Sequence, residues 1–393
     1  MQGDLITLCL AGDVMLGRGV DQILPHPGDP ALAEAYVHDA RSYVELAEAS
    51  NGPIPRPVAF SWPWGDALPT IDRAAPDAVV LNLETSVTLS DDFAPGKGVH
   101  YRMHPANLPC LAAARPDVCV LANNHVLDFG RRGLAETLDV LAGAGFAVAG
   151  AGADAEAARR AAAVPLRGGG RVLVRSFGMP SSGIPPGWAA SADRSGVDYV
   201  AEASEEAAAS VAARIRREKR PGDVVVASVH WGSNWGYAVP RDQVRFAHAL
   251  VDGGADVVHG HSSHHPRPLE LYRGRLIAYG CGDLINDYEG ITGHEQYRDD
   301  LRLLYFPSID PDGGALRALR IAPFRARRMR LREPPPEDFR WLRDLLGRIS
   351  RGFAGPLALD TDGTLTATAR GWPDRPVRGD SGTSGTGARG GTS

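Results

Sequence analysis

Short apolar runs alternate with amphipathic stretches along most of the chain. Between the apolar runs, hydrophobic residues at helical spacing predict helices over 133–145, 202–219 and 241–254. Strands that alternate with helices predict an α/β fold built in layers. Seven runs rich in Val, Leu and Ile have the pattern of buried strands: LITLCLAGDV (5–14), DAVVLNLETSV (77–87), DVCVLANN (117–124), RVLVRSFGM (171–179), DVVVASVHWG (223–232), ADVVHGH (255–261) and RLIAYGCGD (275–283).

The last third of the chain continues the same pattern and then changes. Two more strands are predicted over 304–309 and 315–324, around a PDGG turn, and a proline-led helix is predicted over 335–349. These elements complete a single predicted domain over residues 1–370. From Gly371 the sequence lacks the apolar content that offsets ordering entropy, which predicts a disordered tail over 371–393.

Composition narrows the class of protein. With 393 residues, 44% of them hydrophobic, the chain can bury a sizeable core, and its net charge of -5 gives no basic field for nucleic acid. No apolar run reaches transmembrane length, so no membrane partner is expected. The cysteines show no CxxC spacing, which favours buried reduced thiols and a cytoplasmic location; they are Cys9, Cys110, Cys119 and Cys281.

Polar functional groups recur where the apolar strands end. Ligands of layered α/β proteins bind outside the carboxyl ends of the strands, because successive loops converge there. Taken singly, Asp13 could cap a turn and Asn124 could form an Asx turn. Four imidazoles within 259–265 are costly to bury without partners, which favours metal binding or acid/base work. The strand-end groups are Asp13, Asn82, Glu84, Asn123, Asn124, His125, His230, His259, His261, His264 and Asp283.

The donor types restrict the chemistry. Carboxylate, carboxamide and imidazole groups without any thiolate indicate a hard or borderline cation such as Ca, Mg, Mn, Fe or Zn. The chain has no GxGxxG after a strand, no GxxxxGK[ST], no GxSxG and no HExxH. Nucleotide-binding, serine-hydrolase and zincin interpretations therefore lack support.

Several motifs carry a resemblance to a known family. GDVMLGR (12–18), NLETSVT (82–88), NNHVLDFGRRGLAETLDVL (123–141), VHWGSN (229–234) and GHSSHHPRPLE (260–270) resemble, in order and spacing, the CapA/PgsA family associated with poly-γ-glutamate synthesis. That family looks like a branch of the calcineurin-like metallophosphoesterases, so the resemblance implies an αββα sandwich with a metal at the strand ends. It implies His125 as an acid/base residue that Asp128 could orient. The implied metal ligands are Asp13, Glu84, Asn124, His230, His261 and His264.

Three departures from the family pattern favour a smaller group within it. Asp13-Val14-Met15 replaces the usual Asp-x-His, which favours one metal over two, and YGCGDLINDYEGITGH (279–294) replaces a different segment. The third departure is the lack of a membrane anchor. The chain is thereby similar to the lasso-peptide epimerases of the MslH type. That likeness implies an isomerase that inverts Cα of the C-terminal Trp of a ribosomal precursor peptide beside one divalent cation, Ca²⁺ first and Mn²⁺, Mg²⁺ or Zn²⁺ otherwise.

Epimerisation needs a base on one face of the stereocentre and an acid on the other. We assign His125 with Asp13 or Asp128 to one face. His294 with Asp283 or Asp287 is assigned to the other, although an exposed loop histidine explains His294 equally well. Aromatic walls for an indole are predicted at Trp231, Trp235, Tyr237 and Tyr288. Two alternatives stay open: a metal-dependent hydrolase of phosphoesters or amides, and an accessory protein of poly-γ-glutamate synthesis.

Overall fold

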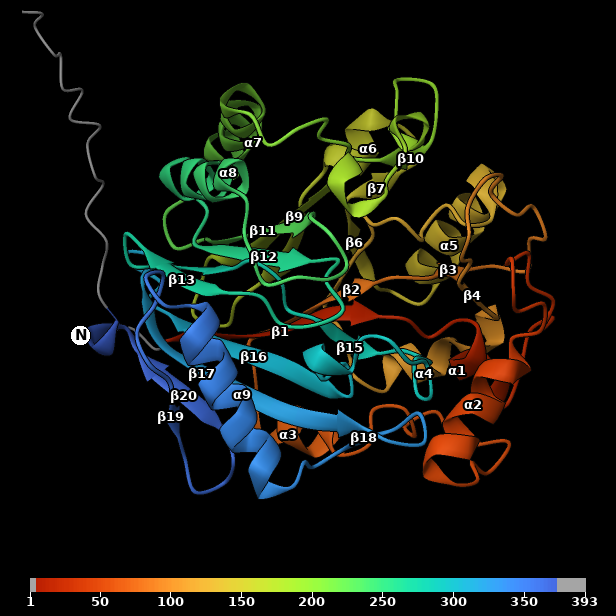
Figure 1. Ribbon diagram of the computed structural model, residues 1–393. Helices are drawn as coiled ribbons and strands as arrows, with labels where there is room; N and C mark the ends of the chain where they lie inside the picture. Colours follow the sequence, from red (N-terminus) through yellow and green to blue (C-terminus); the bar gives the residue numbers. More distant parts are fainter. Residues whose placement is uncertain (1–4, 373–393) are drawn as a thin grey trace, which may run out of the picture.

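Two mixed β-sheets form the centre of the chain in the computed structural model, which describes residues 5–372 (Figure 1). The larger sheet follows the order β19 (Ala358–Leu359), β20 (Leu365–Thr368), β17 (Leu316–Ala326), β16 (Leu301–Ile309), β1 (Ile6–Val14), β2 (Ala78–Leu83), β5 (Val118–Val120) and β6 (Ala147–Ala149), with β15 (Asp283–Ile285) beside β1 and β18 (Leu331–Arg332) beside β17. The smaller sheet follows the order β13 (Leu269–Tyr272), β14 (Arg275–Ala278), β12 (Val257–His261), β11 (Val224–His230), β9 (Arg171–Gly178) and β8 (Ala162–Pro165).

The two sheets pack face to face through alternating apolar side chains. Leu8 and Leu10 of β1 share one buried cluster with Val224 and Val226 of β11, as expected where side chains of a strand alternate between its two faces. The outer face of the larger sheet packs against α1 (Gly19–Ile23), α2 (Arg41–Asn51), α3 (Ala67–Ala74), α4 (Leu108–Ala112) and α5 (Gly130–Gly143). The outer face of the smaller sheet packs against α7 (Glu205–Glu218) and α8 (Arg241–Asp252).

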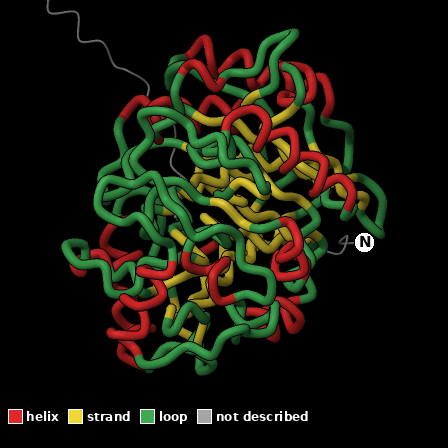
Figure 2. Tube along the Cα trace, turned by 90° about the vertical axis from the view of Figure 1, so that its right-hand side faces the viewer, coloured by secondary structure: helices red, strands yellow, loops and turns green. Residues whose placement is uncertain are grey.

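The molecule therefore has four layers, helices on sheet on sheet on helices, and the mixed α/β prediction is confirmed. Figure 2 shows the strands in the middle of the molecule and the helices around them. The remaining helices are α6 (Ala155–Arg159) and α9 (Pro336–Ile349), and two small pairs of strands join β10 (Gly196–Val197) to β7 (Ala151–Gly152) and β3 (Ser86–Val87) to β4 (Arg102–Met103).

Local signals explain why the predicted helices form. In α7 the Ser204 hydroxyl accepts a hydrogen bond from the backbone N–H of Ala207, and glutamates in the first turn and arginines in the last complement the helix dipole. Pro336 begins α9, where its missing N–H costs nothing. The four predicted helices correspond to α5, α7, α8 and α9.

The run 275–283 differs from the prediction of one strand. Its first part is β14 of the smaller sheet, and its last residue, Asp283, begins β15, which pairs in parallel with β1 of the larger sheet. Gly282, with a φ of 77°, lies directly before β15. The segment 275–283 thus crosses from the smaller sheet to the larger one, and it crosses at the strand ends that carry the polar groups.

The remaining expectations differ in how they compare with the structure. The four cysteines are free and buried, as predicted. The tail was predicted from Gly371, but Trp372 is buried in the cluster between the sheets, and residues 373–393 lie outside those described. Within residues 5–372 no helix has the length and apolar character needed to cross a membrane. The cytoplasmic location stays a prediction.

Candidate metal centre at the strand ends

Two Gly-Asp dipeptides meet at the centre of the site. Asp13 of β1 and Asp283 of β15 are partners in the parallel pairing, and the Asp13 N–H donates to the Gly282 carbonyl over 3.1 Å. A Cβ on Gly12 would lie 1.8 Å from that carbonyl oxygen, so only glycine allows the two backbones to approach so closely. The sequence GD, repeated in two distant strands, thereby brings two carboxylates together.

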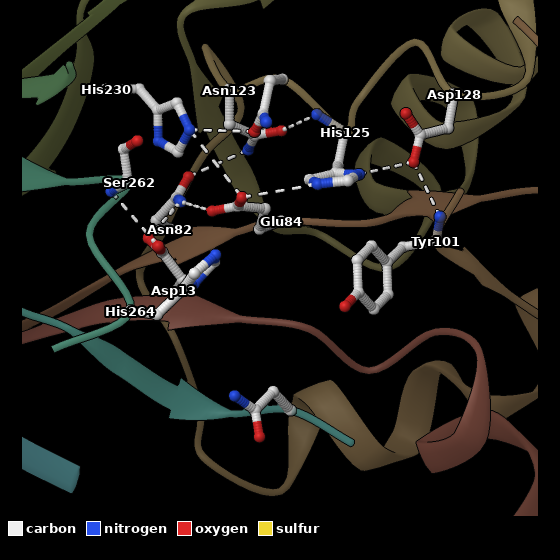
Figure 3. A network of polar contacts seen from close by, with 12 residues as sticks. Asp13, Asn82, Glu84, Tyr101, Asn123, His125, Asp128, His230, Ser262 and His264 are labelled. Atoms are coloured by element: carbon white, nitrogen blue, oxygen red, sulfur yellow. Dashed lines mark hydrogen bonds and ion pairs between the residues drawn. The ribbon is translucent and has the colours of Figure 1, made fainter. Parts of the chain in front are cut away.

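Among residues 5–372, two groups of three side chains could hold a metal ion, and Asp13 belongs to both. The first group adds His230 from the end of β11 and His261 from the end of β12; the second adds His264 and Asp283. Within each group the ligand atoms lie within 4.8 Å of one another, and all of these residues are buried. Asp13 and His264 lie close together in Figure 3, with His230 across from them.

Hydrogen bonds beneath the first group fix which nitrogen of His261 carries a proton. His259 Nε2 lies 3.0 Å from the carbonyl oxygen of Ala11, which can only accept, so Nε2 is protonated and Nδ1 is bare. That bare Nδ1 accepts a hydrogen bond from the Ser228 hydroxyl over 3.1 Å. Ser228 Oγ must then accept from His261 Nε2, 2.8 Å away. The relay leaves Nδ1 of His261 as a free lone pair.

His230 is prepared in the same way. Its Nε2 lies 3.0 Å from Asn124 Oδ1, an acceptor, so its Nδ1 is also bare and faces Nδ1 of His261 at 2.7 Å. Two lone pairs at that distance repel unless a cation or a proton lies between them. Burial holds the pKa of both histidines well below the ordinary value, which disfavours the proton. These residues therefore fit a divalent cation.

The second group is already neutralised by its own charges. His264 Nδ1 lies 3.0 Å from Asp283 Oδ1, and Asp283 Oδ2 accepts from Asn286 over 2.6 Å and lies 3.4 Å from Arg302. Burial lowers the pKa of His264, but the Asp283 carboxylate outweighs it and the pKa ends above the ordinary value. Asp283 is therefore engaged by the His264 imidazole and the Arg302 guanidinium instead of presenting a free charge.

Negative charge accumulates around Asp13. The Asn82 amide donates to Asp13 Oδ1 over 2.8 Å and to Glu84 Oε2 over 2.7 Å, and thus holds two carboxylates side by side. Burial, and then the charge of Asp283, raise the pKa of Asp13 to about 7. Burial and the charge of Asp13 raise the pKa of Glu84 well above its ordinary value. Buried carboxylates destabilised in this way are favourable neighbours for a cation.

Ser262 lies in a strained conformation beside the same carboxylate. Its φ is 102°, and its backbone N–H donates to Asp13 Oδ2 over 3.2 Å. Non-glycine residues hold positive φ only where the surrounding structure imposes it, and such residues concentrate at functional sites.

His125 lies at the edge of the site with a carboxylate behind it (Figure 3). Its Nδ1 lies 2.7 Å from Asp128 Oδ2, as predicted, and the same oxygen accepts from the Tyr101 N–H over 2.7 Å. Its Nε2 points toward Glu84, 3.9 Å from Oε1. Burial lowers the pKa of His125 to about 4, so the imidazole is neutral near pH 7. The arrangement suits a proton acceptor at Nε2.

Lys97 is a member of this arrangement that the sequence interpretation missed. Its Nζ lies 2.8 Å from His125 Nδ1 and forms an ion pair with Asp128 Oδ1. Nδ1 cannot donate to Asp128 and accept from Lys97 at once, so Lys97 and Asp128 compete to set the tautomer. One signal was available: Lys97 is one of only two lysines in a chain that otherwise uses arginine.

The loop carboxylates do not pair with His294. Asp287 is fully buried and accepts two hydrogen bonds from Arg18, at 2.8 and 2.6 Å, and one from the Gly19 N–H. His294 stacks on Trp235 with ring centroids 3.8 Å apart, and within residues 5–372 it forms no ion pair with Asp283 or Asp287. The predicted pairing of His294 with either carboxylate is therefore wrong, because both have other partners.

The four aromatic residues predicted as walls divide into two sets. Trp235 and Tyr288 contact His264, with ring centroids 5.3 and 5.2 Å from it, and Tyr237 packs on His265. Trp231 is 1% exposed and stacks on Tyr279 in the core beneath α8, so its prediction as a wall is wrong. Trp231 directly follows His230, and successive side chains of a strand point to opposite faces of the sheet, so Trp231 points away from the site.

Known proteins resemble this chain over most of its length. A family described as "Bacterial capsule synthesis protein PGA_cap" matches residues 7–288. Two proteins of Mycobacterium tuberculosis, strains CDC 1551 and H37Rv, each named "Probable polyglutamine synthesis accessory protein", are 55% identical over 351 residues, which is 89% of this chain and 92% of theirs. "PGA biosynthesis protein CapA" of Bacillus subtilis is 26% identical over 303 residues, 77% of this chain and 68% of that one.

Among solved structures, the crystal structure of TT1561 of Thermus thermophilus matches with a TM-score of 0.36 and 10% identity, over 79% of this chain and 97% of that chain.

The relatives contradict the predicted isomerase. A lasso-peptide epimerase with a Trp-terminated precursor peptide as partner is wrong, because relatives 55% identical over nearly the whole chain are named for polyglutamine synthesis. The loop 279–294 had suggested that function because its sequence departs from the family pattern. Two of its acidic residues instead make structural contacts, Asp287 with Arg18 and Glu289 with the backbone of Arg328.

Proposed function

The chain belongs to the family of the bacterial capsule synthesis protein PGA_cap, and from this premise we propose that it is an accessory protein of glutamyl-polymer synthesis with a metal-dependent hydrolytic centre. The names of the relatives support the accessory role. One observation carries the hydrolytic centre: bare Nδ1 atoms of His230 and His261 face each other beside the Asp13 carboxylate. The four layers are consistent with the calcineurin-like αββα sandwich that the motifs imply.

One divalent cation would be held by Asp13, His230 and His261. Two imidazole nitrogens with one carboxylate favour Zn²⁺ or Mn²⁺ over Ca²⁺, which takes oxygen ligands. When bound there, the cation supplies Lewis-acid polarisation of a carbonyl or phosphoryl oxygen. The second group stays a pair of internally compensated charges, so a second ion is not needed.

The residues around this position supply proton transfer and orientation. His125 Nε2 accepts a proton from an attacking water and returns it to the leaving amine of a cleaved amide. Asp128 orients the imidazole from behind, and Lys97 holds Asp128 in place. Asn82 keeps the carboxylates of Asp13 and Glu84 in a fixed relation. The bond proposed for cleavage is the amide between glutamyl units.

The test uses metal-stripped protein reconstituted with Zn²⁺ or Mn²⁺ and incubated with poly-γ-glutamate, poly-L-glutamine or a chromogenic phosphodiester. Polymer length is followed by mass spectrometry and light scattering. We expect metal-dependent shortening of a polymer, loss of it in Asp13→Ala, and about 10²–10⁴-fold slower cleavage in His125→Ala. His38→Ala, which removes an exposed histidine, is the matched control.

Two results would overturn the hydrolytic half of the proposal. One is phosphodiester turnover with intact polymers, which would move the site to phosphoesters. The other is no turnover of any substrate by protein shown to hold the ion. The accessory role is tested separately by polymer content in producing cells that lack the gene, with the wild-type gene restored as a control. Unchanged polymer content would contradict that role.

A further inference from the structure

A cavity of about 690 Å³ lies away from the strand ends, where β17 turns back into β18. Its lining includes five arginines from one short segment, which are Arg325, Arg327, Arg328, Arg330 and Arg332. Asp66 and Glu333 are the acidic residues of the same lining, so five positive charges face two negative ones. In a chain with a net charge of -5, this is a local concentration of the opposite sign.

The turn that carries these arginines is held in an unfavourable conformation. Arg328 and Met329 have φ values of 61° and 50°, in the left-handed region. The half-buried Glu289 carboxylate accepts hydrogen bonds from the backbone N–H groups of both residues, and Trp62 Nε1 donates to the Arg328 carbonyl over 3.0 Å. Met329, 3% exposed, packs into the core. Contacts with Glu289 and Trp62 therefore hold the turn whose arginines line the cavity.

The five arginines of the cavity differ in whether they have an ion-pair partner. Arg325 forms ion pairs with Asp300 and Asp338, at 2.9 and 3.6 Å. In the described part of the chain, the other four form no ion pair. Of the two lining carboxylates, Asp66 is occupied by the backbone N–H of Glu333. Four guanidinium groups thus share one cavity without an ion-pair partner among the residues described.

Two of the four are also incompletely hydrogen-bonded. The Nε atoms of Arg328 and Arg330 are buried and have no hydrogen-bond partner among residues 5–372. Arg330 lies over the Trp62 ring, 4.9 Å from its centroid, which fixes the position of its guanidinium group. Buried donors in proteins are nearly always paired, so unpaired ones at a cavity wall point to a ligand that supplies acceptors.

We propose that this arginine cavity binds consecutive carboxylates of an acidic glutamyl polymer; the choice of that polymer rests on the proposed function. Guanidinium forks match carboxylates through two parallel hydrogen bonds, and several forks along one cavity require several anions along one ligand. The volume is that of an ordinary ligand site and admits a short stretch of chain. Glu289, which binds the backbone of the turn, and Asp283 of the strand-end site belong to one segment, 283–289, which links the two regions.

The test compares labelled poly-L-glutamate with poly-L-glutamine of equal length by fluorescence anisotropy, on the full chain, at low and high salt. These two polymers differ in charge and hardly in shape. We expect poly-L-glutamate to bind, with an affinity that falls as salt rises, and poly-L-glutamine not to bind. Arg327→Gln/Arg332→Gln removes two exposed arginines and should weaken binding about tenfold or more.

Arg216→Gln/Arg220→Gln makes the same charge change at exposed positions at and just beyond the end of α7, and should bind like wild type. Asp13→Ala should also keep full binding, which separates a failure of this cavity from a failure of the metal centre. Equal binding of poly-L-glutamine, equal loss in the α7 control, or tighter binding of polyphosphate than of poly-L-glutamate would each overturn the proposal. Thermal unfolding of every variant confirms that it is folded.

Discussion

The strand-end site has two halves that share Asp13 and differ in how their charges are settled. In one half, His230 and His261 direct bare nitrogens at each other because Asn124 and Ser228 occupy their outer nitrogens. In the other, His264 is paired with Asp283, and Arg302 lies behind that carboxylate. The same residue types thus form a ligand set in one half and an ion-pair network in the other. Hydrogen-bond partners decide between them.

The largest expected effect separates the halves directly. His261→Ala removes a ligand and should reduce cation affinity by more than the roughly 10–100-fold typical of lost outer partners, whereas His264→Ala should cost less than about tenfold. Competition with a coloured chelator and elemental analysis measure both. Equal losses in the two variants would mean that both halves hold the ion.

Variants of the hydrogen-bond relay from His259 through Ser228 to His261 should have the next largest effect on cation affinity. Ser228→Ala and His259→Ala both leave the metal ligands in place. Ser228→Ala removes the group that accepts from His261 Nε2, and His259→Ala removes the group that orients the Ser228 hydroxyl. We expect cation affinity to fall about 10–100-fold in each. The exposed histidine variant His38→Ala gives the baseline. Wild-type affinity in His259→Ala would show that the relay does not set the tautomer.

Asp283→Asn tests the ion pair between Asp283 and His264 in the second half of the site. Because the Asp283 carboxylate raises the pKa of His264, removing its charge should lower that pKa. Histidine NMR titration of the metal-free variant detects the shift. Cation affinity should change less than in His261→Ala, since Asp283 belongs only to the compensated group. An unchanged His264 titration would refute the ion pair.

Lys97→Met should have the smallest effect of these variants, a shift in how the rate of hydrolysis depends on pH. Burial lowers the pKa of His125 most, and the Lys97 charge lowers it further. Without that charge the pKa of His125 should rise, so His125 becomes protonated at a higher pH and the acid limb of the rate profile moves upward. Rate measurements across pH, with Lys219→Met as the matched control, test this. A profile that stays in place would remove Lys97 from the His125 environment.

The convergence of strand ends explains what the sequence could predict. Asp13 lies next to the end of β1, and His230 and His261 end β11 and β12. Parallel strands bring their carboxyl ends to one edge, so these side chains meet as expected. The layers followed from the same runs, because alternating apolar positions in the strands face either the other sheet or the helices.

What the sequence could not predict depends on distant partners. Asp283 and Asp287 are four residues apart in the sequence, yet only the structure shows Arg18, 269 positions away, paired with Asp287. The sequence did not predict helices α1 to α3, because prolines interrupt the segment between β1 and β2 and it has no long stretch with hydrophobic residues at helical spacing. Trp231 could have been assigned correctly, because strand alternation already directs it away from His230.

Anomalous diffraction from crystals grown with Mn²⁺ tests the central claim most directly, because it locates the ion independently of activity. The account predicts one strong peak bounded by His230 Nδ1, His261 Nδ1 and the Asp13 carboxylate. A peak only between His264 and Asp283, or no peak at the strand ends at saturating Mn²⁺, would contradict it.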